Sequence, residues 1–230
     1  MAGCGSYVPY CIDAPTVDHQ GDLQADAAIY SVSGYGVIFH AGTTVGITNH
    51  IGAQLYVSNF QNWHYQGSAG WFTRVGDNGV AAIYGGFSYG EAGFASVKDP
   101  ESLSMVGTNR TAFLQGVWGW NGLHFPSEVK ARHDVNFSLK AGFMLSPMTL
   151  DYYLYSMLDP NDDPVRCYDV PFIYRSLLLE PQLEWRYGWE HLKFSLKVAL
   201  DLTANLNKDP RPIPFKSFPI MIGLGINYRL

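Results

Sequence analysis

Residues 191–203 read HLKFSLKVALDLT, and this stretch decides the fold class of the chain. Large apolar residues occupy every second position from Leu192 to Leu202, and polar or small residues occupy the positions between them. A period of two places alternate side chains on opposite faces of a β-strand, whereas a helix would need a period near 3.6. The stretch therefore predicts a strand with one apolar face and one polar face.

The same period returns along most of the chain. It is clear at 134–145, 176–187 and 216–230, and fainter in the first half. We expect ten strands, at 21–31, 35–48, 51–59, 64–74, 79–88, 111–120, 134–145, 171–187, 190–203 and 216–230. Counts from eight to twelve are also possible. One more hairpin, at Tyr152, Tyr153 and Tyr155, would raise the count to twelve.

Composition narrows the class. Charged residues make up 15% of the 230 residues, against about 25% in ordinary soluble domains. No stretch approaches the roughly 18 consecutive apolar residues of a membrane-spanning helix. With a net charge of −5, the chain has no basic tract for nucleic acid, and we expect no nucleic-acid partner.

Two architectures fit alternating strands. A soluble sandwich or lipocalin-like barrel buries the apolar face, whereas a transmembrane barrel turns it outward to lipid. The polar face favours the membrane barrel. Opposite charges would pair across neighbouring strands on this face, and Gly, Ser and Ala fill the positions between them. Such a face suits a narrow lumen better than a solvated surface. A four-residue turn at 187–190 would place Arg186, Glu184 and Glu180 opposite His191, Lys193 and Lys197 respectively. We expect a lumenal charge network of Lys140, Glu180, Glu184, Arg186, Lys193, Lys197, Asp201 and Arg229.

Aromatic residues and the last strand also favour a membrane barrel. Aromatics gather where strands end, and we expect a girdle at the membrane interface formed by Trp118, Trp120, Trp185, Tyr187, Trp189 and Tyr228. The chain stops on a strand in which Gly225, Tyr228 and Leu230 resemble the C-terminal β-signal of outer-membrane proteins, although the usual last residue is Phe. The predicted fold is a closed antiparallel up-and-down transmembrane β-barrel of about ten strands.

Loop lengths give an orientation. Short turns are expected at 49–50, 76–79 and 188–189, and longer connections at 89–110, 146–170 and 204–215. With a periplasmic N-terminus the three long connections are all extracellular, as in outer-membrane barrels. The short connection at 31–35 and the longer one at 121–133 are exceptions.

The N-terminal region divides the chain into two parts. Residues 1–20 form a periplasmic lead and residues 21–230 the barrel. Met1-Ala2-Gly3-Cys4 resembles the end of a bacterial lipoprotein signal, so we expect a lipid on Cys4; the alternative is a free cysteine in a tail. Cys11 and Cys167 would lie at opposite ends of the barrel, which argues against a disulfide between them unless the lead threads the lumen.

A family resemblance rests on the lead and the first hairpin. The motifs are Tyr7-Val8-Pro9, Ala14-Pro15, Gly21-Asp22-Leu23-Gln24-Ala25 and Thr48-Asn49-His50-Ile51-Gly52. They resemble small outer-membrane barrel lipoproteins of Bacteroidota, a largely uncharacterised family, over about a fifth of the chain. The resemblance implies an envelope location more than any chemistry.

Catalytic and metal-binding motifs are missing from the sequence. The seven histidines show no metal spacing, and there is no GxSxG elbow, P-loop or CxxC. An omptin-like protease would need a histidine and carboxylates at the extracellular rim, where the candidates are His64, Asp99, Glu101, Asp201, Asp159, Asn161, Asp162 and Asp163. Their spacing selects no pair, and a lipase-like site has no better support. Asp159, Asp162 and Asp163 could bind a divalent cation, but Pro160 and Pro164 favour a plain turn. We expect no catalytic residue, cofactor or metal.

Three functions follow from these expectations. The first is a non-enzymatic, lipid-anchored barrel that serves as an accessory subunit of a larger outer-membrane complex, contacting membrane lipid and other outer-membrane or surface-lipoprotein subunits. The second is a narrow channel or small-ligand binder that uses the charged lumen. The third is an outer-membrane hydrolase with its site at the rim.

Overall fold

The structure, a computed structural model, describes residues 14–32, 36–60, 62–98, 101–123, 131–154, 165–207 and 220–230. The regular elements within these ranges are all β-strands. Their bounds are β1 Leu23–Val32, β2 Gly36–Gly46, β3 Ile51–Phe60, β4 Asn62–Val75, β5 Gly79–Lys98, β6 Glu101–Leu123, β7 Arg132–Leu154, β8 Val165–Gly188, β9 Leu192–Leu200, β10 Leu202–Asn205 and β11 Ile220–Arg229.

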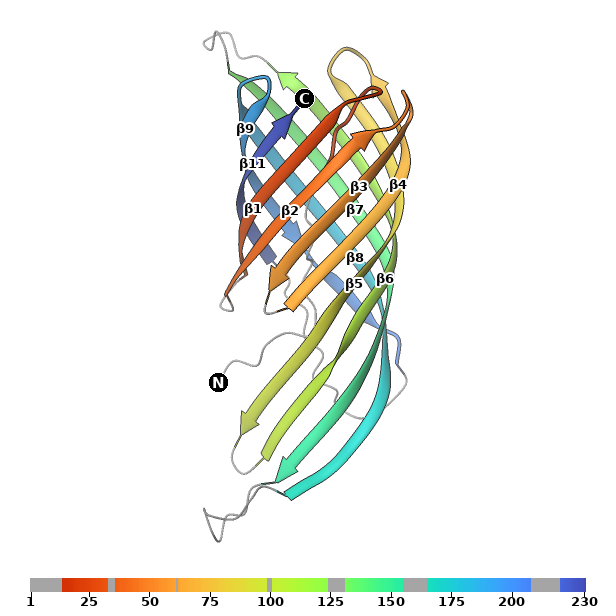
Figure 1. Ribbon diagram of the computed structural model, residues 1–230, viewed down its shortest axis with the longest axis vertical. Coiled ribbons are helices and arrows are strands. Elements are labelled where there is room, and N and C mark those ends of the chain that lie inside the picture. Colours follow the sequence, from red (N-terminus) through yellow and green to blue (C-terminus); the bar gives the residue numbers. More distant parts are fainter. Residues whose placement is uncertain are drawn as a thin grey trace.

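The strands form one closed antiparallel sheet (Figure 1). Each strand from β1 to β8 pairs with the next, β8 pairs with β9, β9 with β11, and β11 with β1. β10 continues β9 in the same register along β8, since Gln182 lies opposite Ala199 and Leu179 opposite Leu202. The two segments are one strand with a break, and the sheet is a barrel of ten strands, as predicted.

Proline explains the break between β9 and β10. In this register Pro181 falls opposite Leu200, the last residue of β9. Proline has no N–H to donate to a neighbouring strand, so one ladder hydrogen bond is lost there. The chain resumes its strand at Leu202.

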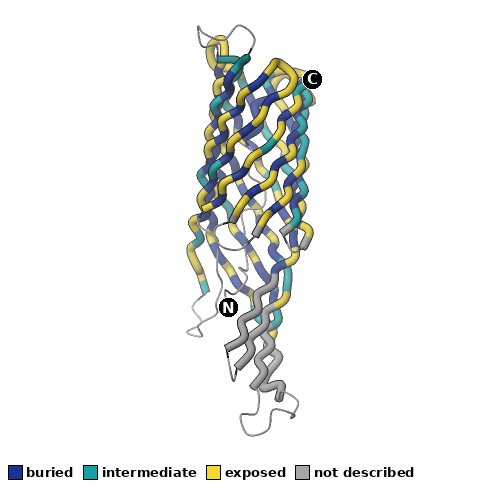
Figure 2. Tube along the Cα trace, turned by 90° about the vertical axis from the view of Figure 1, so that its left-hand side faces the viewer, coloured by how far each residue is buried: buried dark blue, intermediate teal, exposed yellow. Residues whose placement is uncertain are grey.

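The barrel is polar inside and apolar outside. Figure 2 shows buried and exposed residues alternating along each strand. In the stretch 191–203, Lys197 is fully buried, whereas Phe194 on the other face is 54% exposed. Such a surface is stable only against hydrocarbon, and closure satisfies the backbone without a free edge. No helix among the described residues is long and apolar enough to cross a membrane.

Two expected long connections are wrong. Most of 89–110 and 146–170 is strand, because β5 and β6 extend to Lys98 and Glu101, and β7 and β8 extend to Leu154 and Val165. Tyr152 and Tyr153 belong to β7 and not to a separate hairpin. Figure 1 shows β5–β8 projecting beyond the ends of the other strands. A strand that leaves the bilayer has no need of an apolar outer face, so the period of two fades although the backbone pairing continues.

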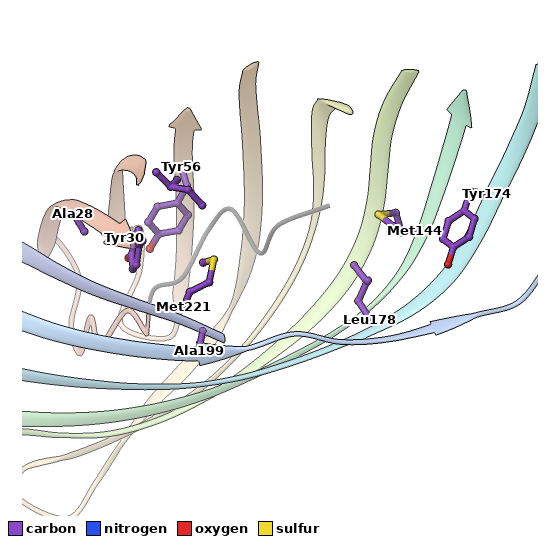
Figure 3. Close-up of a cluster of buried hydrophobic side chains, with 9 residues drawn as sticks. Ala28, Tyr30, Tyr56, Met144, Tyr174, Leu178, Ala199 and Met221 are labelled. Atoms are coloured by element: carbon purple, nitrogen blue, oxygen red, sulfur yellow. The ribbon is translucent and has the colours of Figure 1, made fainter. Parts of the chain in front are cut away.

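Glycine makes room for large side chains inside the wall. Tyr30 lies opposite Gly223, Tyr56 opposite Gly42, and the ring of each tyrosine covers the glycine beside it. A Cβ atom on Gly223 would lie 2.1 Å from Cδ1 of Tyr30. These tyrosines belong to a buried apolar cluster in which Figure 3 shows two groups of side chains on separate strands: Ala28, Tyr30, Tyr56, Ala199 and Met221 in one, and Met144, Tyr174 and Leu178 in the other.

Replacing Gly223 with alanine should destabilise the barrel. The added methyl group would overlap the Tyr30 ring, and overpacking of this kind costs about 1–3 kcal/mol. Urea unfolding in lipid vesicles measures the loss. Gly116→Ala is the matched control, because nothing lies within 4 Å of a Cβ atom built there. Equal free energies of unfolding for the two variants would contradict this account.

Candidate functional site

The interior of the barrel is the candidate site, because all eight residues of the expected charge network lie there. Seven of them are buried on the lumenal face, and Arg229 is partly buried at the end of β11. The expected register between β8 and β9 is wrong, however. Glu184 lies opposite Lys197, and Arg186 lies opposite Ser195. The turn lies at 189–192 and not at 187–190, since the N–H of Trp189 donates to the carbonyl of Leu192 at 2.8 Å; this displacement by two residues shifts every cross-strand pair by four.

Lys197 is the centre of the network. Its Nζ lies 2.7 Å from Oδ2 of Asp26 and 3.4 Å from Oε1 of Glu184. The other carboxylate oxygen of Glu184 accepts a hydrogen bond of 2.6 Å from Nη2 of Arg186. Nε2 of His40 lies 3.2 Å from Oδ1 of Asp26. The group joins β1 and β2 to β8 and β9, and sequence reasoning missed Asp26 and His40 because strands far apart in sequence supply them.

The remaining members of the network form separate pairs. Lys193 donates to Oδ1 of Asp134 at 2.6 Å, and Lys140 forms an ion pair with Glu180, which lies opposite it on β8. Asp201 accepts a hydrogen bond from Thr203 at 2.9 Å. Buried charges are tolerated when they are paired in this way.

Arg229 links the start of the first strand to the end of the last strand. Its guanidinium makes two hydrogen bonds to the carboxylate of Asp22, at 2.8 Å and 2.6 Å, and lies 2.9 Å from Oδ1 of Asp18. The N–H of Leu230 donates to the carbonyl of Leu23. Planar two-point pairing of arginine with carboxylate is strong and directional. Asp22 directly precedes the first strand and Arg229 ends the last, so this contact closes the sheet.

The described part of the expected lead lies inside the barrel. Ala14 is fully buried and Val17 is 1% exposed, and both pack with Phe72, Ala82, Tyr84 and Val117 of the wall. Exposure rises toward His19, so the chain runs from the lumen to the rim before β1 begins. The rest of the expected lead, including Cys4 and Cys11, lies outside the described residues.

Polar contacts hold this segment in place. Arg186 donates to the carbonyl of Ala14 at 3.1 Å and to Oγ1 of Thr16 at 3.3 Å. Thr16 Oγ1 also donates to Oδ1 of Asn121 at 3.0 Å, and Nδ2 of Asn121 donates back to the carbonyl of Thr16 at 3.2 Å. Gly119 leaves the space, since a Cβ atom there would lie 2.6 Å from Cγ2 of Thr16. The wall is shaped to hold the segment Ala14–Asp22, which we call the lumenal plug.

A polar cavity of about 360 Å³ opens beside the plug at this end of the barrel. Its lining carries both signs of charge, and includes Asp18, Arg74, Arg132, Glu190, Lys193 and Arg229. Asp18, His19 and Asp22 offer ligand atoms within 4.8 Å of one another, a spacing that could suit a metal. Arg229 contacts both Asp18 and Asp22, so these two carboxylates bind a guanidinium group instead of a metal.

The six residues expected to form the girdle lie on the outer surface at one end. Each is between 38% and 56% exposed, and two of the rings, those of Trp118 and Trp120, meet edge to face at 5.9 Å. Tyr228 and Leu230 of the expected β-signal point outward at the same end, while Gly225 lies opposite Ala28 of β1.

A second aromatic group, which the sequence did not reveal, lies toward the other end of the barrel. Trp63, Tyr65 and Tyr89 are about half exposed, and Tyr65 pairs with Tyr89. From Tyr89 to Gly79 along β5, where Gly79 lies opposite Trp120 of the girdle, is roughly 33 Å at about 3.3 Å per residue, or roughly 25 Å across a bilayer after strand tilt. The two groups bound a band of about the height that the hydrocarbon requires.

Of the residues considered for a hydrolase, the two whose side chains the structure describes, His64 and Asp201, do not come together. His64 is only 2% exposed and lies on β4, and Asp201 follows β9 on the opposite side of the ten-strand ring. The side chains of Asp99, Glu101, Asp159, Asn161, Asp162 and Asp163 lie outside the part of the chain that the structure describes.

The arrangement of wall, lumen and girdles has one physical meaning. This chain is a membrane-spanning barrel of the outer-membrane type.

No family model matches the chain, and no curated protein matches it. Among solved structures it is similar to the N-terminal β-barrel domain of OprF from Pseudomonas aeruginosa, with 13% identity, a TM-score of 0.35 and coverage of 92% of this chain and 98% of that one. It is also similar to the translocator domain of the autotransporter NalP from Neisseria meningitidis, with 10% identity, a TM-score of 0.38 and coverage of 91% and 86%. The fold assignment rests on the strand pairing and not on these distant likenesses.

Replacing Lys197 with methionine should strongly destabilise the barrel. Asp26 and Glu184 would lose the cation between them, and breaking a buried ion pair from one side costs about 3–5 kcal/mol. The free energy of unfolding in lipid vesicles is the measurement. Arg132→Met is the control, because the pair of Arg132 with Glu190 is exposed and 3.8 Å long, and such pairs contribute about 1 kcal/mol or less. A loss for Lys197→Met no larger than that of the control would argue against a stabilising network.

Acid should loosen the plug at the rim. Asp18 lies outside the strands, and burial by itself would raise its pKa. The hydrogen bonds and charges of His19, Arg229 and Arg74 outweigh burial, so the pKa of Asp18 lies below its ordinary value of 3.8. A carboxyl with a lowered folded pKa stabilises the docked state above its ordinary pKa, and that contribution disappears as the pH falls through the folded pKa.

We therefore expect the plug to stay docked above pH 3.8 and to loosen below it. The amide chemical shift of Asp18, followed by NMR during an acid titration, reports the change because its N–H donates to Asp22. The Asp18→Asn variant should show a smaller change over the same range. A transition well above the ordinary pKa of Asp18 would contradict this assignment.

Proposed function

We propose that this chain is a non-conducting, non-enzymatic barrel that serves as an accessory subunit of a larger outer-membrane complex. The single observation that carries the proposal is the set of groups that lie inside the described part of the lumen. The plug occupies the girdle end, paired charges occupy the level of Lys197, and an apolar cluster that includes Tyr30 and Met144 is buried in the same interior. With the interior filled, the loops and the outer surfaces are left for function.

The projection of β5–β8 is the surface that best suits contact with a partner. The other strands end within the barrel, while these four continue as an antiparallel sheet (Figure 1). The ladder holds from Ala92 opposite Gly107 to Lys98 opposite Glu101. A sheet that projects beyond the other strands can reach another subunit without distorting the barrel.

A lipid on Cys4 forms part of the proposal. A single acyl chain gives only weak membrane binding, but the membrane-spanning wall would add to it. The supporting observation is the sequence Met1-Ala2-Gly3-Cys4. The mass of the N-terminal peptide from native membranes tests it.

Conductance is the first test of the proposed role. In planar bilayers the purified barrel should give no large, persistent current, because the plug and the charge network fill the lumen. A pore-forming barrel would instead show long-lived channel openings. Sustained current through the wild-type protein would overturn the non-conducting assignment.

Gentle detergent extraction tests the partnership. The native protein should leave the membrane together with other outer-membrane or surface-lipoprotein subunits, which mass spectrometry identifies. Extraction of a lone monomer under several mild detergents would count against an accessory role.

A narrow channel or small-ligand barrel is the second candidate. The cavity of about 360 Å³ favours it, because Lys193 and Arg229 line that cavity and belong to the charge network. A small polar ligand could therefore reach the network from the girdle end. A continuous water path past Glu184 and Lys197 would support this role over the first.

A further inference from the structure

The projecting sheet has two outer edges, one on β5 and one on β8. β4 pairs with β5 as far as Gly90, and β10 pairs with β8 only from Ser176 to Leu179. Among the described residues, no strand pairs with β5 from Ala92 to Lys98 on the side away from β6. An unpaired edge presents N–H and C=O groups that can bind another strand.

Register identifies which residues present these groups. The carbonyl of Asn78 accepts a hydrogen bond from the N–H of Asn121, in line with the β5–β6 ladder. In an antiparallel pair, alternate residues direct both backbone groups to the same neighbour. The ladder from Gly79 to Lys98 has no register shift, so even-numbered residues face β6. Gly93, Ala95 and Val97 therefore present their N–H and C=O groups to the open edge.

The edge on β8 is protected against pairing. The carbonyl of Arg175 accepts from the N–H of Leu206, so odd-numbered residues of β8 face away from β7. Pro171 is one of them and has no N–H to offer, and Arg166 and Asp169 add charges to the same stretch. Proline and charged residues are the features by which natural edges avoid pairing. On β5, the stretch AGFASVK at 92–98 has no proline and only one charge, at its end.

We propose that the β5 edge binds an extended segment of another protein, which adds to the projecting sheet as an antiparallel strand. The segment would span about seven residues and be rich in β-branched or aromatic side chains, as strands generally are. This inference rests on the proposed function and names the docking mode of the partner.

A second copy of this chain fits the edge less well. Two copies inserted in one membrane have the same orientation, so their β5 strands run in the same direction and could pair only in parallel. Isolated parallel pairs are less stable than antiparallel ones. Pairing of β5 with β8 of a neighbouring copy would be antiparallel, but Pro171 interrupts that edge. A partner strand of free direction meets neither obstacle.

Amide hydrogen exchange tests the docking mode. The probes are the gently extracted native complex and the same barrel refolded alone in detergent. The amides of Gly93, Ala95 and Val97 should exchange at least tenfold more slowly in the complex, whereas those of Phe94 and Ser96 should be equally slow in both. Equal rates for the odd-numbered amides would overturn the proposal. Slow exchange in the refolded barrel would assign the edge to its own chain, and protection that grows with barrel concentration would assign it to a second copy.

Proline substitution gives an independent test. Ala95→Pro removes one N–H from the open edge and should reduce co-extracted partner at least tenfold, while Ala95→Val keeps that N–H and should retain the partner. Heat-modifiable gel mobility checks that both variants form the barrel. Full retention by Ala95→Pro would refute edge docking and leave the accessory role intact, whereas a wild-type protein without any partner would refute the accessory role itself.

Discussion

Closure between β1 and β11 is the constraint on which the rest of the structure depends. Hydrocarbon offers no hydrogen bonds, so a sheet can cross it only if its first and last strands pair. The ladder from Gln24 opposite Arg229 to Val32 opposite Met221 meets this requirement. Arg229 and Asp22 add a two-point ion pair at its end, and Lys197 reaches Asp26, the third residue of the ladder. Side-chain contacts thus reinforce the junction that the backbone must make.

The same constraint explains how the interior is filled. The outer face must be apolar, so the charges of a weakly charged chain gather in a small lumen where each needs a counter-charge. Lys193 with Asp134 and Lys140 with Glu180 show this pairing between neighbouring strands. Glycine opposite tyrosine lets large rings lie along the wall. The plug adds Arg186 contacts to Ala14 and Thr16, so charged pairs, large rings and the plug all lie inside the described barrel.

On the proposed non-conducting role, the outer surfaces of the barrel are the parts left for function. The wall between the two aromatic groups faces lipid, and three turns at the girdle end, β2–β3, β4–β5 and β8–β9, are short. The sheet formed by the ends of β5–β8 is the part that the membrane does not require. Its two edges differ, since Pro171 interrupts the edge on β8, whereas the stretch 92–98 of β5 has no proline. The edge on β5 is therefore the one at which the projecting sheet can bind another strand.

The sequence by itself determined the class of fold, a count near ten strands and, for the four clearest strands, the apolar and polar faces, because a period of two is a local property of the chain. It also indicated which charges lie in the lumen. Only the tertiary structure decided the pairs, since register depends on the turn at Trp189 and one shift changes every partner, as Glu184 with Lys197 shows. Asp26 and the plug could not be found from local patterns, because their partners Lys197 and Arg186 are distant in sequence and are brought near by closure. His40 joins the network through Asp26 on the neighbouring strand. The length of β5–β8 escaped prediction for a related reason: outside the bilayer, backbone pairing defines a strand without any apolar period.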